Sequence, residues 1–89
     1  MKCVVSVLGK DRSGIVAAVA NVLADCKANI DDISQTILGD VFSMTMLVTL
    51  SPEDADFNVV QEQLGEVAQR LGVQITIQRQ DVFDFMYSL

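Results

Sequence analysis

The stretch that decides the fold is Val4–Val22, which reads VVSVLGKDRSGIVAAVANV. The residues at its start belong to the segment Cys3–Leu8, which is rich in β-branched residues and apolar at odd and even positions alike. This pattern is typical of a central strand covered on both faces. From Ile15 onward the apolar residues recur at helical spacing. The chain is therefore predicted to pass from a strand into an amphipathic helix across Gly9–Gly14, and the helical pattern ends at Ala28–Asn29.

The start of this helix has two interpretations. The first turn of a helix leaves backbone N–H groups unpaired and carries the positive end of the helix dipole, so it can bind a carboxylate or a phosphate. Gly14 would let such an anion approach the backbone closely. Alternatively, the side chain of Asp11 or Ser13 caps the helix and no ligand is involved. Local sequence leaves both interpretations open.

The composition narrows the class of function. The length of 89 residues predicts one domain, residues 1–89. At this size the hydrophobic core alone gives only a small net stability, and contact with a partner chain would increase that stability. The net charge of −6 argues against binding to nucleic acid or to an anionic membrane surface. No apolar run approaches the length of a membrane span and no leader pattern opens the sequence, so we expect a cytoplasmic protein.

The chain contains no histidine. It therefore lacks the usual general base, the usual metal ligand and the imidazole of a catalytic triad, and neither a metal nor another cofactor is expected. Cys3 and Cys26 have no metal-ligand or redox spacing and are interpreted as buried small side chains rather than as a disulfide. The paired carboxylates are interpreted as solvated surface groups rather than metal ligands: Asp31 with Asp32, and Asp81 with Asp84.

Residues 30–50 alternate with period two around Gly39-Asp40, a pair suited to a two-residue hairpin turn. Gln35 then lies on the apolar side of the hairpin and needs a polar partner or a local change of register. The predicted register places Ile37 opposite Phe42, Gln35 opposite Met44 and Ile33 opposite Met46. It puts Ser34, Thr36, Ser43 and Thr45 on the other side, beside Leu38 and Val41.

A second helix is predicted after residue 50, with Ser51 as its cap and Pro52 in its first turn. Its apolar stripe ends at Gly72, while Gly65 inside it indicates either close packing against a neighbour or a small tolerated loss of stability. Residues 73–78 alternate as a last, half-exposed strand. The stripe consists of Phe57, Val60, Leu64, Val67 and Leu71.

The tail, Asp81–Leu89, is predicted to form a short helix capped by Asp81. It holds three of the five aromatic residues, Phe83, Phe85 and Tyr87. A chain terminus rarely exposes so much apolar surface, so the tail either folds back on the sheet or packs on another subunit. We favour the contact between subunits.

The order strand, helix, strand, strand, helix, strand predicts an α+β, ferredoxin-like fold. Its four-stranded antiparallel sheet has the order 4-1-3-2, with two helices on one face and the short C-terminal helix after the last strand. The opposite face and the edge of the second strand are left uncovered. The apolarity of Cys3–Leu8 on both sides then predicts that sheets pair between two chains.

The segments GKDRSGIV (residues 9–16) and ANIDDIS (residues 28–34), placed around one amphipathic helix in this order of elements, resemble the ACT domain family. The resemblance covers nearly all of the chain, and it is similar in particular to stand-alone ACT proteins and to ACT segments of glycine-cleavage transcriptional repressors. It implies a non-catalytic, allosteric regulatory module, a homodimer or higher homo-oligomer, which binds a free amino acid between subunits.

The resemblance also implies a set of site residues. Gly14 and Ile15 would donate backbone N–H groups to the ligand carboxylate, and Asp11 and Asn29 would hold its ammonium or a polar side chain. Arg12 would steer the carboxylate. Ser13 stands where the family often has proline, and Ala28 where it often has glycine. The implied site therefore comprises Asp11, Arg12, Ser13, Gly14, Ile15, Asn29 and Ile30.

Two other functions compete with this one. The chain can be a module that binds only another protein, through its exposed face and aromatic tail. It can also be an acylphosphatase-like hydrolase of the same fold, in which Arg12 would cradle phosphate and Asn29 would orient water. That family places its arginine just inside the helix, whereas here Ile15–Ala18 follows the turn.

Overall fold

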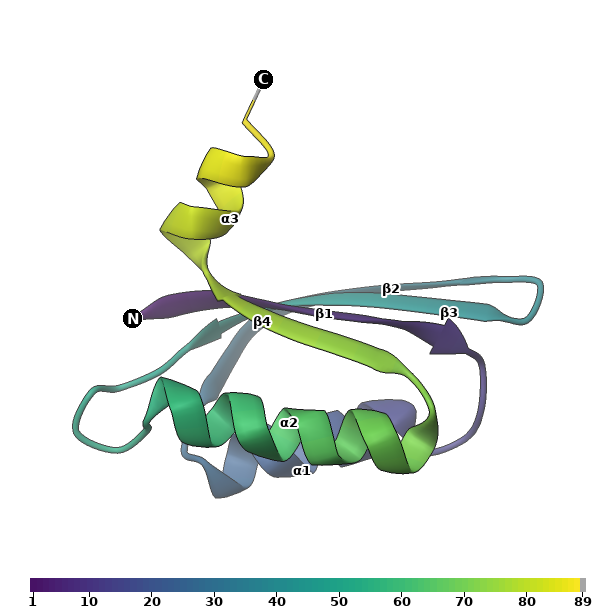
Figure 1. The fold of residues 1–89 in the computed structure, drawn as a ribbon, viewed down its shortest axis with the longest axis horizontal. Coiled ribbons are helices and arrows are strands. Elements are labelled where there is room, and N and C mark those ends of the chain that lie inside the picture. Colours follow the sequence, from purple (N-terminus) through teal and green to yellow (C-terminus); the bar gives the residue numbers. More distant parts are fainter. Residues whose placement is uncertain (89) are drawn as a thin grey trace.

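The predicted order of elements is confirmed in the computed structural model, which describes residues 1–88 (Figure 1). Leu89, the last residue of the predicted tail helix, lies outside the described residues. Among the helices of residues 1–88, none is long and apolar enough to cross a membrane. The elements are β1 (Lys2–Lys10), α1 (Ile15–Asp25), β2 (Asn29–Leu38), β3 (Val41–Thr49), α2 (Phe57–Leu71), β4 (Gln74–Arg79) and α3 (Gln80–Met86).

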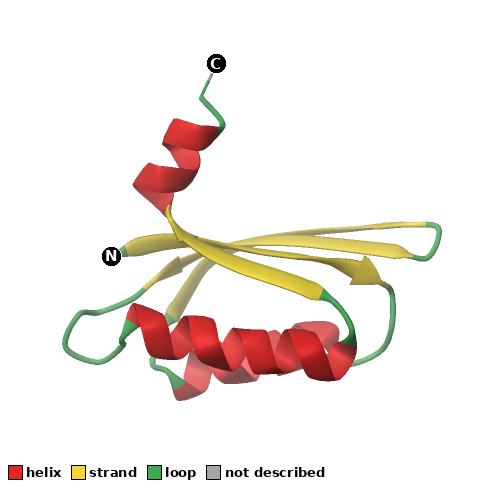
Figure 2. Ribbon diagram, viewed as in Figure 1, coloured by secondary structure: helices red, strands yellow, loops and turns green. Residues whose placement is uncertain are grey.

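The strands form one antiparallel sheet in the order β2-β3-β1-β4, which is the predicted order 4-1-3-2 counted from the other edge. Helices α1 and α2 lie side by side on one face of it (Figure 2). The core fills the space between this face and the two helices, and it contains Ile15, Val19 and Leu23 of α1 and Val60, Leu64 and Val67 of α2. The fold is therefore α+β and ferredoxin-like, as predicted.

The central strand β1 is apolar on both sides for two different reasons. Cys3, Val5 and Val7 point into the core beneath the helices and are fully buried. Val4 points to the opposite face and is only 4% exposed. That face carries α3, which contacts β1 and β4 (Figure 1). Part of the apolarity that predicted pairing between chains is thus covered by the chain's own last helix, while Leu8, farther along the same side, stays 49% exposed.

The predicted register of the hairpin is confirmed, including the pairs of Gln35 with Met44 and of Ile37 with Phe42. Every residue of β2 is nevertheless exposed, whereas Phe42 and Met44 in β3 are buried. Because β2 is an outer strand and Gln35 is exposed, its side chain stays in contact with solvent and needs neither a partner nor a shift. The one irregularity is a bulge between Ile30 and Asp32.

The predicted start of the second helix at Ser51 is wrong. Residues 51–55 form an isolated turn, in which the Ser51 carbonyl accepts from the backbone N–H groups of Asp54 and Ala55 at 3.0 and 2.8 Å. The chain then extends at Asp56, whose side chain accepts from the Asn58 N–H at 2.8 Å and caps α2. Both segments carry capping chemistry, and only the second leads into the apolar stripe. The predicted end at Gly72 is confirmed, at φ 69°.

Two glycines have different structural roles. A Cβ at Gly9 would lie 2.6 Å from the Val73 Cγ1 atom, so only glycine allows the end of β1 to approach the connection between α2 and β4. A Cβ at Gly65 would meet nothing within 4 Å, so no close packing within residues 1–88 accounts for that glycine.

Cys3 and Cys26 are buried free thiols, as predicted.

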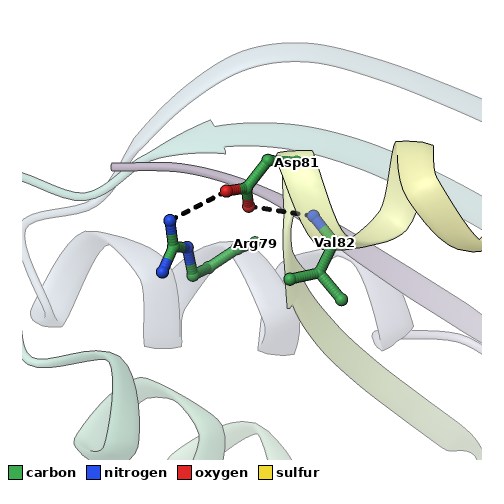
Figure 3. A network of polar contacts seen from close by, with 3 residues as sticks. All are labelled: Arg79, Asp81 and Val82. Atoms are coloured by element: carbon green, nitrogen blue, oxygen red, sulfur yellow. Dashed lines mark hydrogen bonds and ion pairs between the residues drawn. The ribbon is translucent and has the colours of Figure 1, made fainter.

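The predicted capping of the tail helix by Asp81 is also wrong. Strand β4 runs directly into α3, so the cap position falls on Arg79, and no side chain caps the helix. Asp81 lies in the first turn, where its carboxylate accepts from the Arg79 guanidinium at 2.8 Å and from the Val82 backbone N–H at 2.9 Å (Figure 3). These contacts join the last residue of the strand to the start of the helix.

Candidate functional site

The turn between β1 and α1 leads into a helix whose start has no side-chain cap. Gly14 is the residue before the helix, in the left-handed conformation at φ 88°, and no side chain caps the helix. The alternative in which Asp11 or Ser13 is the cap is therefore not realised. Nothing lies within 4 Å of the position that a Cβ of Gly14 would take, so the space beside the turn is open to a ligand.

This turn is held in place from two sides. The buried side chain of Ile15 anchors the first turn of α1 in the core. The Asp11 backbone N–H donates to the Asp40 carbonyl at 2.7 Å, which ties the turn to the tip of the β2–β3 hairpin. Asp11, Arg12 and Ser13 are all exposed, so their side chains are available to a ligand beside the turn.

The second group of predicted residues lies at the start of β2. Asn29 donates through its Nδ2 atom to the Asp31 Oδ1 atom at 2.6 Å, and the Thr49 hydroxyl donates to the other oxygen of the same carboxylate. Asp31 is the extra residue of the bulge between Ile30 and Asp32, which takes it out of the regular pairing with β3. Three side chains from two strands thus meet at one exposed carboxylate.

Hydrogen bonding keeps the Asp31 carboxylate charged. The bond from Thr49 and then the bond from Asn29 lower its pKa from the ordinary value, and the positive charge of Lys2 acts in the same direction. A carboxylate only accepts hydrogen bonds, so Asn29 must turn its NH₂ group toward Asp31. The carbonyl oxygen of Asn29 then remains available as an acceptor.

Sequence reasoning missed Asp31, because a carboxylate next to another in a polar stretch is usually a solvated group. The available signal was the hairpin register. Counting back from Gly39-Asp40 places Thr49 close to residues 29–31, and a threonine hydroxyl near an Asn-x-Asp segment favours such a cluster.

The two groups of predicted residues lie at opposite ends of the sheet. Asn29 is paired with Thr49, which is paired with Lys2 at the start of β1, whereas Asp11 and Gly14 follow the end of β1. A nine-residue strand separates them, which corresponds to about 30 Å. One chain therefore cannot bring both groups to one small ligand, and within one chain Arg12 and Asn29 do not form the hydrolase pair.

A cavity of about 550 Å³ lies elsewhere, beside the start of α3. It contains none of the predicted site residues, and its lining carries charges of both signs. No group of three or more His, Cys, Asp or Glu side chains within residues 1–88 is arranged to hold a metal ion. The cavity is lined by Met1, Lys2, Arg79, Gln80, Asp81 and Asp84.

Comparison with known proteins gives consistent results. The model of the ACT domain family matches residues 2–78. A UPF0237 protein of Methanocaldococcus jannaschii is 46% identical over 88 residues, which cover 99% of this chain and 98% of that protein. The structure of an ACT domain protein from Streptococcus pneumoniae is similar at a TM-score of 0.80 and 44% identity, covering 98% of each chain. A putative glycine cleavage system transcriptional repressor is similar at a TM-score of 0.79 and 25% identity, covering 89% of this chain and 45% of that one.

Proposed function

The chain belongs to the ACT domain family, whose members are typically ligand-binding regulatory modules, and from this premise we propose that it is a non-catalytic sensor that binds a free amino acid as a homodimer. The observation that carries the proposal is the division of the candidate site. Anion-binding backbone donors lie at one end of the sheet, and acceptors suited to an ammonium group lie at the other. A zwitterion needs both kinds of group.

The arrangement requires two β2 strands to pair. β2 is an edge strand, and in residues 1–88 its outer edge has no partner. Two such edges joined antiparallel about a twofold axis put Asn29 of one chain beside Leu38 of the partner. The partner's hairpin tip is tied to its β1–α1 turn through the bond between Asp11 and Asp40. Each Asn29 then lies at the end of the paired sheets that holds the β1–α1 turn of the other chain, so each of two equivalent sites draws on both chains.

The hydrogen bonds within the chain set the orientation of the ligand. Its carboxylate accepts from the backbone N–H groups of Gly14 and Ile15 at the uncapped start of α1, with Arg12 adding positive charge. Its ammonium donates to the carbonyl oxygen of Asn29, because the amide nitrogen is committed to Asp31. The ionised Asp31 adds negative charge beside the ammonium.

Regulation follows from a site shared by two chains. A ligand that bridges the subunits binds the dimer and not the separate chains, so its concentration shifts the assembly equilibrium. The two free buried thiols fit a reducing cytoplasm. A partner protein that binds only one of the two assembly states would then respond to the ligand.

A thermal-shift screen of the standard amino acids, followed by calorimetry of each hit, tests the proposal. A ligand present at 100 times its Kd stabilises the folded state by about 2.7 kcal/mol, which raises the Tm of a chain of this size by roughly 10 to 20 °C. Asp11→Ala and Asn29→Ala should remove the shift. Asn21→Ala, which truncates an exposed amide on α1 away from both groups, should keep it. If no amino acid raises the Tm, the module that binds only protein becomes the better account.

A further inference from the structure

The face of the sheet away from α1 and α2 has an unusual composition. Its middle row consists of four hydroxyl side chains from four adjacent strands: Ser34, Thr45, Ser6 and Thr76. Two lysines and two aspartates are its only strand charges and they cancel, although the whole chain carries −6. The strands of this face therefore add no net repulsion between two acidic chains, while α3 adds Asp84 and the Asp81 carboxylate, which is paired with Arg79. The four charged residues are Lys2, Lys10, Asp31 and Asp32.

One end of this open face is apolar and bare. Leu8 is 49% exposed, Val41 is 45% exposed and Leu38 is 78% exposed. Leu38 is paired with Val41, and Val41 is also paired with Lys10, the next residue after Leu8 on the same side of β1. We call Leu8, Leu38 and Val41 the distal patch. It lies at the hairpin end of the sheet.

The other end of the same face carries α3, which rises away from the sheet (Figure 1). No side chain of α3 is buried, and Phe85 is 85% exposed. Its position is nevertheless defined by its own chain. Asp81 links Arg79 to Val82 at the joint (Figure 3), the rings of Phe83 and Tyr87 are 4.6 Å apart, and the Gln78 amide donates to the Met86 sulfur at 3.6 Å. An ordered helix with an uncovered apolar side is typical of an interaction surface.

We propose that a second copy of this chain docks on the open face, so that α3 of each copy covers the distal patch of the other. A projecting helix and a bare patch at opposite ends of one face become complementary when a twofold axis lies parallel to the sheet and perpendicular to the strands. In that arrangement Phe85 approaches the partner's Leu8. The exposed carboxylate of Asp84 approaches the partner's Lys10, which gives an attractive pair.

The hydroxyl-lined middle of the face fits this geometry. A helix at each end keeps the two sheets apart, and serine and threonine side chains remain hydrogen-bonded to water in the space between them. The contact is separate from the edge of β2 and does not require a ligand. Together the two contacts build an assembly of four chains, and the open-face contact alone builds a dimer.

Molar mass in solution tests the contact. Phe85→Asp on α3 and Leu8→Asp on the distal patch should each halve the mass of the wild-type assembly, measured by light scattering after size exclusion. Val59→Asp, an equally apolar and 44% exposed position on α2, should leave the mass unchanged. A wild-type chain that is monomeric at 100 µM, or a Phe85→Asp variant with the wild-type mass, would overturn the proposal. Phe85 contributes nothing to the core, so its variant should fold even where Leu8→Asp does not.

Crosslinking identifies the arrangement. Chains carrying Leu8→Cys mixed with chains carrying Phe85→Cys should form a disulfide-linked pair under mild oxidation, because the two positions lie at opposite ends of one chain and meet only across the contact. Each single variant alone is the control, and Cys3 and Cys26 are buried. Equal yields in the mixture and in the controls would count against the proposed geometry. The amino-acid thermal shift should persist in Phe85→Asp, which separates a failure here from a failure of the proposed ligand site.

Discussion

Asp31 shows how a single side chain sets the properties of its neighbours. Its carboxylate is held by Asn29 from the same strand and by Thr49 from the adjacent strand. The contact fixes which end of the Asn29 amide faces outward, and it therefore fixes the polarity of the group that we assign to the ligand ammonium. Neither consequence requires Asp31 to touch the ligand.

The pKa of Asp31 makes this cluster testable by pH. The folded-state pKa is lowered from 3.8 by the Thr49 and Asn29 hydrogen bonds, so the charged form stabilises the fold above the unfolded pKa and this stabilisation is lost as pH falls through the folded pKa. Asp31→Asn should therefore lower the urea midpoint at pH 7, and its difference from the wild type should shrink below about pH 4. Thr49→Val should raise the Asp31 pKa toward 3.8 in an NMR titration. A difference in midpoint that is equal at pH 7 and pH 3 would contradict this account.

At the scale of elements, the sequence predicts the repeat pattern of each helix and strand better than it predicts the residues at which they begin and end. The stripe that ends at Leu71 and the register around Gly39 both follow from repeated spacing, which averages over many residues. A helix start depends on one or two residues, and Ser51 and Asp56 both offer capping oxygens. The decision between them comes from the turn that Ser51 closes with Asp54 and Ala55, which no local pattern reveals.

The capping of α2 gives a matched pair of variants. Asp56→Ala removes the acceptor of the Asn58 N–H and should lower the free energy of unfolding by about 1 kcal/mol. Ser51→Ala removes a hydroxyl at the position first predicted as the cap and should change it by less than about 0.5 kcal/mol. Urea unfolding at pH 7 measures both. The reverse order of effects would place the start of the helix at Ser51 after all.

The exposure of a side chain is a second property that the repeat pattern of the sequence does not predict by itself. Ile33 and Ile37 alternate as core residues do, yet both are exposed on β2, which is an edge strand of the sheet. Alternation therefore identifies the face of a strand but not what covers it. Which element covers each face depends on the arrangement of the whole sheet and on any partner chain.

At the scale of the whole molecule, the structure of one chain is enough to test the predicted topology, but it is not enough to test the predicted site. The fold follows from the order of elements and from right-handed crossovers, and it is confirmed. The site residues were chosen by resemblance, and the structure places Asp11 and Asn29 about 30 Å apart along a nine-residue strand. The resemblance implied a ligand held between two chains, but the sequence does not say which surfaces the chains use, so it named both halves of the site without joining them.

Mixed dimers test whether two chains share each site. Asp11→Ala and Asn29→Ala chains should each fail to bind the amino acid found in the screen. After the two are mixed and allowed to exchange, about a quarter of the wild-type sites should return, because about half of the dimers are mixed and each mixed dimer has one intact site of two. Calorimetry gives the number of sites. Failure to recover any binding, with exchange shown by mass spectrometry, would place the site within one chain.

The bulge at Asp31 has a consequence for the chain before it meets a partner. A straight, fully exposed edge strand is a template for cross-β growth, and all ten residues of β2 are exposed. The bulge interrupts the flat edge near its start, and Asp31 and Asp32 add two negative charges beside it. A bulge and charges of this kind oppose the stacking of many identical edges into a fibril, which matters most for a newly synthesised chain that has no partner.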